Sequence, residues 1–87
     1  MRELCGHGVG RRIHEPPSVP NFYDSRSKSR LTEGLVITIE PIVAAGTARG
    51  VLQKDGWTIR TADGALSAHY EQTLVITKSA PILLTAA

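Results

Sequence analysis

Residues 35–46, LVITIEPIVAAG, form the stretch that decides the fold. The stretch is rich in β-branched side chains and is bounded by Gly34 and Gly46, which is typical of a β-strand. A second stretch at 67–77, SAHYEQTLVIT, has the same character and shares the tetrapeptide LVIT with the first. Both stretches therefore predict strands.

Each predicted strand carries one carboxylate on the face opposite its leucine and isoleucine side chains. Side chains alternate along a strand. Glu40 therefore points to the face opposite to that of Ile37 on its own strand, and Glu71 points to the face opposite to that of Leu74. If the strands are neighbours in one sheet, both carboxylates project from the same face, where a cation would offset their repulsion. The same alternation is also expected if this face of an antiparallel sheet is exposed to water. The alternation therefore allows either a cation site or a solvated face.

The rest of the sequence is dominated by turn and loop signals. Asp55-Gly56 and Asp63-Gly64 are tight-turn dipeptides, each followed by a predicted strand at 57–61 or 67–77. Prolines at positions 16, 17 and 20 exclude a helix there, and no long window has apolar residues at helical spacing. We therefore predict a mostly antiparallel β structure with little helix.

Length and composition restrict the protein to one small domain, residues 1–87. A chain of this size buries only about 60% of the surface that its unfolded form exposes, so its core is thin. Its apolar share of 41% and charged share of 21% are ordinary for a globular protein. A single cysteine, Cys5, excludes an internal disulfide and favours the cytoplasm.

Charge and hydropathy narrow the expected partners. No apolar stretch is long enough to span a bilayer or to form a signal-peptide core, so we expect no membrane partner. The net charge of +2 comes largely from Arg11, Arg12 and the polar loop 24–32. These cations lack interleaved aromatic residues, so we expect solvated loop charge rather than a nucleic-acid site.

A set of motifs in a fixed order carries a family resemblance. The motifs are GHGVGR, HEPP and VPNF within 6–22, TIEP at 38–41, DGWT at 55–58 and SAHYEQT at 67–73. Together they resemble the type I methionine aminopeptidases over nearly the whole chain. DGWT and this form of TIEP separate that family from the proline-specific peptidases and creatinase, which share its fold. The resemblance implies an α+β pita-bread fold, with residues 1–87 as the strand-rich C-terminal part of its catalytic domain.

The resemblance implies a site for two divalent metal ions held by one histidine, two glutamates and two aspartates. By motif match, His7 and Glu40 would bind the same metal, and Glu71 would bridge both. A mixed set of imidazole and carboxylate ligands suits Mn, Fe, Co or Zn. Gly6 and Gly8 are expected to leave room for a ligand beside His7.

The resemblance also assigns residues to the substrate. His14 would contact the substrate and stabilise the tetrahedral intermediate electrostatically. Ile13 and Trp57 would line the pocket for the methionine side chain, where an indole suits a thioether. His69 matches no motif position, so it is expected at the surface or in packing.

Two departures from the family pattern affect the expected activity. The family's aspartate ligands lie upstream of the GHG motif, and Asp24, Asp55 and Asp63 match neither of them. Gln72 replaces the usual histidine after the bridging glutamate, so the surroundings of Glu71 are expected to differ. The upstream part also supplies covering helices, and we expect the chain to be inactive without it.

The resemblance implies a cytoplasmic metalloaminopeptidase that removes the N-terminal methionine from nascent polypeptides. Its partners would be the nascent chain and the upstream part of the catalytic domain. The alternative is a non-catalytic β module with a vestigial or mononuclear metal site. That module would self-associate through an uncovered apolar face formed by Leu35, Ile37, Ile39, Leu74 and Ile76.

Overall fold

The computed structural model describes residues 4–86, and this part of the chain forms β-strands and no helix. A five-stranded sheet has the order β2-β1-β3-β8-β9, and two further pairs are β4-β7 and β5-β6. The strands are β1 (Gly6–Gly8), β2 (Glu15–Val19), β3 (Val36–Ile39), β4 (Ile42–Ala44), β5 (Gly50–Leu52), β6 (Ile59–Thr61), β7 (Ser67–His69), β8 (Gln72–Val75) and β9 (Ile82–Leu83). Within residues 4–86, no helix is available to cross a membrane.

The two long strands predicted from the sequence are each divided in two. Residues 35–46 form β3 and β4, residues 67–77 form β7 and β8, and the halves pair antiparallel as β3-β8 and β4-β7. The prediction of continuous strands is therefore wrong. Pro41 has no N–H for the ladder, although its carbonyl accepts a hydrogen bond from Tyr70 N at 3.2 Å.

The GHG segment forms strand β1, which lies between β2 and β3. A Cβ atom on Gly6 would lie 2.1 Å from the carbonyl oxygen of Thr38, and one on Gly8 would lie 2.1 Å from that of Pro16. The glycines therefore allow neighbouring strands to approach closely. The expectation that they make room for a ligand is wrong.

The proline-rich segment after β1 forms the edge strand β2, and the predicted absence of a helix there is confirmed. An edge strand tolerates proline because one side of its backbone needs no partner. The register pairs His7 with Ser18 and Gly8 with Glu15, with an irregularity between His7 and Gly8. This pairing fixes β1 beside β2.

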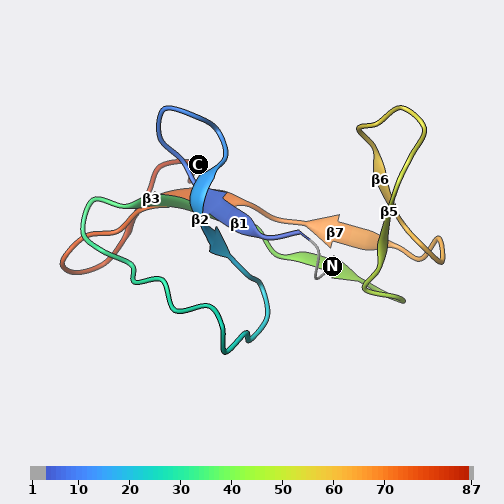
Figure 1. The fold of residues 1–87 in the computed structure, drawn as a ribbon, viewed down its shortest axis with the longest axis horizontal. Coiled ribbons are helices and arrows are strands. Elements are labelled where there is room, and N and C mark those ends of the chain that lie inside the picture. The colour runs from blue at the N-terminus through green and yellow to red at the C-terminus, as the bar shows by residue number, and fades with distance from the viewer. Residues whose placement is uncertain (1–3, 87) are drawn as a thin grey trace.

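The two predicted Asp-Gly turns are confirmed. Gly56 and Gly64 have φ angles of +71° and +74°, a left-handed conformation that glycine adopts without strain. Gly56 lies in the turn between β5 and β6, and Gly64 lies between β6 and β7. Figure 1 shows the β5-β6 hairpin at one end of the molecule and the five-stranded sheet at the other, with β7 between them.

The core is small. Ile37 and Leu74, which are paired across β3 and β8, are buried apolar residues, and Thr38 is buried beside them. Two of the residues expected on an uncovered apolar face are thus in the core, so that part of the expectation is wrong. The Cα radius of gyration is 14.4 Å, against about 12 Å for a compact chain of this length.

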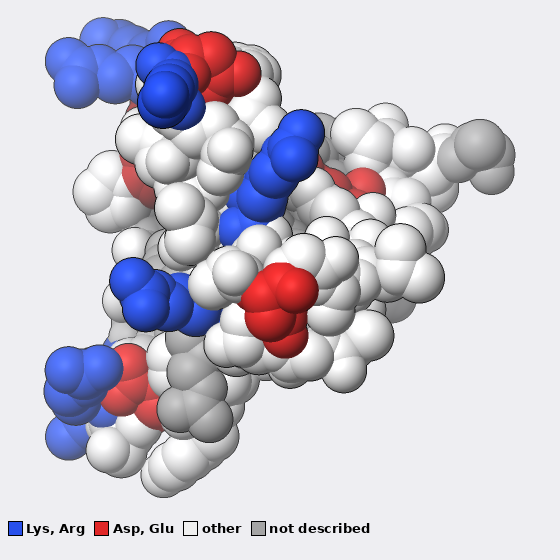
Figure 2. Space-filling view, turned by 90° about the vertical axis from the view of Figure 1, so that its right-hand side faces the viewer, with Lys and Arg blue, Asp and Glu red and all other residues white. Residues whose placement is uncertain are grey.

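Charged side chains are spread over the surface. On the face shown in Figure 2, basic side chains are separated by uncharged or acidic ones. Within the polar loop 24–32, Arg26 forms an ion pair with Asp24 at 2.9 Å, so part of the loop charge is neutralised locally.

Candidate metal centre

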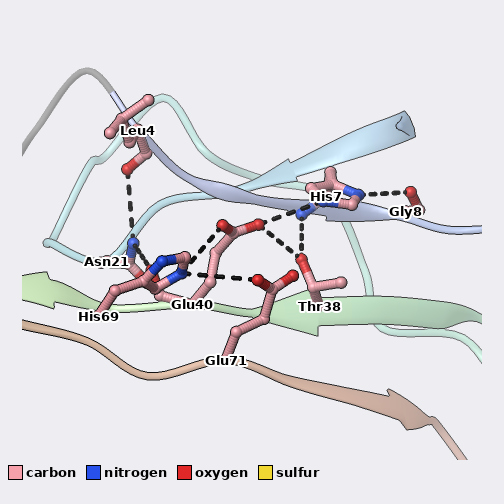
Figure 3. Close-up of polar contacts among 8 residues, drawn as sticks. All are labelled: Leu4, His7, Gly8, Asn21, Thr38, Glu40, His69 and Glu71. Carbon is pink, nitrogen blue, oxygen red and sulfur yellow. Dashed lines mark hydrogen bonds and ion pairs between the residues drawn. The ribbon is translucent and has the colours of Figure 1, made fainter. Parts of the chain in front are cut away.

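The three predicted metal ligands come together from three parts of the chain. His7 lies on β1, Glu40 directly follows β3, and Glu71 directly precedes β8. The register pairs Ile39 with Gln72, so the next residues along each strand, Glu40 and Glu71, face each other. One ligand atom from each of the three side chains lies within 4.8 Å of the other two (Figure 3).

The His7 ring is oriented as a metal ligand. Its Nδ1 lies 2.9 Å from the carbonyl oxygen of Gly8, to which it donates a hydrogen bond. Its Nε2 then carries a lone pair and lies 3.2 Å from Glu40 Oε1. Two lone pairs facing each other at this distance need a proton or a cation between them, and ligating histidines commonly donate their other N–H in this way. The ring therefore fits a metal ion.

Glu40 is held by groups from two sides. The hydroxyl of buried Thr38 donates to Glu40 Oε1 at 2.9 Å and accepts a hydrogen bond from His7 N at 3.1 Å. Asn21 Nδ2 donates to the backbone oxygens of Glu40 at 3.2 Å and Leu4 at 3.4 Å. Thr38 thus couples the orientation of the carboxylate to the position of β1.

The centre is closed on one side and open on the other. The His7 and Glu40 side chains are 14% and 13% exposed, whereas that of Glu71 is 40% exposed. A cavity of about 790 Å³ lies over the cluster and is lined by all three ligands, with Trp57 and Ile42 among the other residues. Its size suits a small molecule or a short peptide end.

Two of the three residues assigned to the substrate lie at this cavity. The His14 ring lies 4.2 Å from the His7 ring, measured between centroids, and both line the cavity. Trp57 lines the same cavity with an exposed side chain. Ile13 is exposed and is not among the described lining residues. The roles of all three remain predictions.

His69 is a site residue that the sequence interpretation missed. Its Nε2 lies 3.5 Å from Glu40 Oε2 and 3.5 Å from Glu71 Oε2 (Figure 3). Strand alternation could have found it, because His69 precedes Glu71 by two residues and so projects from the same side. The expected surface position is confirmed, because the side chain is 46% exposed, and the structure adds that the ring faces the two carboxylates.

The Gln72 side chain contacts residues other than Glu71, and the expected effect of this replacement on the surroundings of Glu71 stays a prediction. Its side chain donates to Tyr70 Oη at 2.9 Å and accepts a hydrogen bond from the Thr85 hydroxyl. Consecutive residues of a strand point to opposite faces, so Gln72 points away from the metal centre.

The aspartates hold turns, as their mismatch to the metal motif predicts. The Thr58 hydroxyl and the Thr58 and Trp57 amides donate to Asp55 and lower the pKa of its carboxyl group. Backbone amides of Thr47 and Ala65 likewise lower the pKa of Asp63. The aspartate of the DGWT motif thus has a structural role, because the Asp55 carboxylate holds the turn from which Trp57 projects.

Comparisons with known proteins agree on the family. The model of metallopeptidase family M24 matches residues 1–78. The methionine aminopeptidase of Aquifex aeolicus is 50% identical over 82 residues, covering 92% of this chain and 32% of that protein. The methionine aminopeptidase of Escherichia coli K12 is 49% identical over 85 residues, covering 98% of this chain and 32% of that protein.

Solved structures agree on the fold. The crystal structure of methionine aminopeptidase from Thermotoga maritima superposes with a TM-score of 0.92 at 41% identity, covering all of this chain and 35% of that one. That from Rickettsia prowazekii gives 0.89 at 40% identity, with 98% and 35% coverage. The predicted fold class is confirmed: the chain carries a strand-rich part of the pita-bread fold and spans about a third of the length of its relatives. This chain belongs to metallopeptidase family M24.

Proposed function

We propose that this chain serves the metal-dependent removal of N-terminal methionine from nascent polypeptides in the cytoplasm, as the C-terminal portion of a catalytic domain. The observation that carries the proposal is the convergence of His7, Glu40 and Glu71 within 4.8 Å of one another. Relatives named methionine aminopeptidase support the substrate class.

The donor set supports a transition metal. An imidazole with two carboxylates suits Mn, Fe, Co or Zn better than Ca or Mg. Bound by these residues, such an ion would supply an activated water near neutral pH and would polarise the scissile carbonyl. A complete site would hold two ions, and Glu71, which is on the open side, would bridge them.

The remaining groups of the cavity orient the substrate. The His14 imidazole, beside His7, would donate a hydrogen bond to the developing oxyanion of the reacting peptide bond. Trp57 would pack against the methionine side chain at the cavity wall. The Thr38 hydroxyl keeps the Glu40 carboxylate turned toward His7.

The test is release of methionine from a Met-Ala peptide with added Mn or Co. The chain alone should give no release, whereas the chain mixed with the upstream part of the Escherichia coli relative should restore it. A Glu71→Gln variant in the same mixture should stay inactive, because it loses the bridging carboxylate. Turnover by the isolated chain would contradict the proposal that it needs the upstream part.

A self-associating β module remains the second candidate. It is favoured by the exposed apolar side chains of the edge strand β9, Ile82 and Leu83, and of the hairpin residues Leu52 and Ile59. Absence of methionine release even from the mixture with the upstream part would favour this self-associating module.

A further inference from the structure

His69 lies beside both carboxylates of the metal centre, although it matches no motif of the sequence. It ends β7, where its cross-strand partner on β4 is Ile42. Glu71 follows His69 by two residues, and Glu40 precedes Ile42 by two. Side chains two residues apart project from one side of a strand, so the imidazole is placed next to the two acids.

The contacts of His69 are those of one N–H shared between two acceptors. Its Nε2 lies 3.5 Å from Glu40 Oε2 and 3.5 Å from Glu71 Oε2 (Figure 3). An N–H donated to a single oxygen ordinarily gives a distance of about 2.7–3.2 Å. The two longer, equal distances therefore describe a ring that faces both carboxylates rather than one. An imidazole carries a proton on Nε2 in its cation and in one of its neutral tautomers.

The two oxygens of Glu40 have different neighbours. Oε1 accepts a hydrogen bond from the Thr38 hydroxyl at 2.9 Å and lies 3.2 Å from His7 Nε2. Oε2 instead faces His69. The oxygen on the His7 side is thus the one directed to the candidate metal centre, and His69 contacts the other oxygen from outside. Outer contacts of this kind set the orientation of ligating carboxylates.

Glu71 depends on His69 more than Glu40 does. The Glu71 side chain is 40% exposed, against 13% for that of Glu40. Among residues 4–86, the polar contact that the Glu71 carboxylate makes is the one with His69. Ordering an exposed glutamate side chain costs conformational entropy. Without this contact, the Glu71 carboxylate would therefore turn into water.

The proximity of the two carboxylates also needs a partner. One oxygen of each lies within 4.8 Å of one of the other, so the two charges repel each other. Among the described residues that line the cavity, none is a lysine or an arginine. His7 contacts Glu40 alone, whereas His69 contacts both acids. The His69 N–H is therefore the group that offsets their repulsion before an ion binds.

We propose that His69 is a positioning residue: its Nε2–H holds the Glu40 and Glu71 carboxylates side by side, in the orientation that the metal centre requires, and is not itself a ligand. The inference rests on the proposed function in taking the two glutamates as ligands. Zn²⁺ binding and the conformation of Glu71 are both measured on the chain alone. Failure of methionine release therefore leaves this test unaffected.

Two variants test the role by Zn²⁺ titration of the full chain at neutral pH, in competition with a chelator. His69→Gln keeps an N–H donor and should bind Zn²⁺ within about threefold of the parent, whereas His69→Leu lacks the donor and should bind at least about tenfold more weakly. Arg60→Gln, an exposed change outside the cavity lining, is the control and should bind as the parent does.

Equal Zn²⁺ binding by the parent and His69→Leu would overturn the proposal. Equal weakening in His69→Leu and His69→Gln would overturn it as well, because the imidazole itself, rather than its N–H, would then be required.

A measurement on the unaltered chain keeps the test independent of how the variants fold. The three-bond couplings between the Hα and Hβ protons of Glu71 report its χ1 angle. In the metal-free parent chain, we expect the couplings of a single rotamer, and in folded His69→Leu we expect averaged values. Averaged couplings in the metal-free parent would show that His69 does not hold Glu71 and would overturn the proposal.

Discussion

At the scale of single residues, the metal centre depends on a buried hydroxyl that carries no charge. Thr38 is buried, accepts the His7 amide at 3.1 Å and donates to Glu40 at 2.9 Å. One side chain therefore links the strand that carries the imidazole to the carboxylate that faces it. Outer groups of this kind set the orientation of metal ligands.

Replacing this hydroxyl should weaken both metal binding and the fold. In Thr38→Val, the His7 amide loses its acceptor and Glu40 loses a donor. We expect about tenfold weaker Zn²⁺ binding and a loss of about 1–3 kcal/mol in the free energy of unfolding. Chelator competition and urea unfolding measure the two effects. Thr32→Val, at an exposed position, should change neither.

Gly8 of β1 should tolerate no side chain. A Cβ on Gly8 would lie 2.1 Å from the Pro16 carbonyl oxygen, so Gly8→Ala must displace backbone. We expect a loss of about 3 kcal/mol or more, which is in the range of severe core substitutions. In the control Gly10→Ala, the nearest atoms belong to the flexible Glu15 side chain, so the loss should be smaller. Equal urea midpoints for the two variants would contradict this account.

At the scale of elements, the site lies where two strand pairs meet. The β3-β8 and β4-β7 ladders use the same two chain segments, and the break between them falls at Pro41 and Tyr70. Glu40 and Glu71 occupy this break. The register is the same on both sides of the break, since Ile39 pairs with Gln72 and Ile42 with His69, so His69 and Glu71 project from the same side.

The β5-β6 hairpin should loosen in acid. Hydrogen bonds from Thr58 and Trp57 hold the folded pKa of Asp55 below its ordinary value, which is about 3.9 in an unfolded chain. The carboxylate therefore stabilises the turn fully above that value and ceases to do so as the pH falls through the lower, folded pKa.

The chemical shifts of the Trp57 and Thr58 amides report this titration. Their midpoint should lie below the ordinary aspartate value in the folded chain and return to it in concentrated urea. Asp55→Asn should remove the transition. A folded-state midpoint at or above the value in urea would contradict the turn geometry.

At the scale of the whole molecule, the chain is extended and exposes many apolar side chains. Its principal extents are 42 × 28 × 23 Å, and its buried apolar core comprises Ile37 and Leu74 among the described residues. The edge strand β9 presents Ile82 and Leu83, both about half exposed. Exposed apolar edges of this kind favour association.

We therefore expect the chain to associate in solution. Light scattering should give a mass above that of the monomer, rising with concentration, because burial of the exposed apolar surface drives association. Replacing both Ile82 and Leu83 with threonine should lower the mass toward the monomer while leaving Zn²⁺ binding intact. A monomer at every concentration would contradict this expectation.

The sequence by itself determined the strand character, the Asp-Gly turns and the side of its own strand from which Glu40 or Glu71 projects, because these follow from local backbone preferences and the two-residue period of a strand. Only the tertiary structure decided that the GHG segment is a strand between β2 and β3, and that His7 and His69 both lie within 3.5 Å of a Glu40 oxygen. These features depend on contacts between distant segments, such as His7 with Thr38, 31 residues apart. No local pattern encodes such distances.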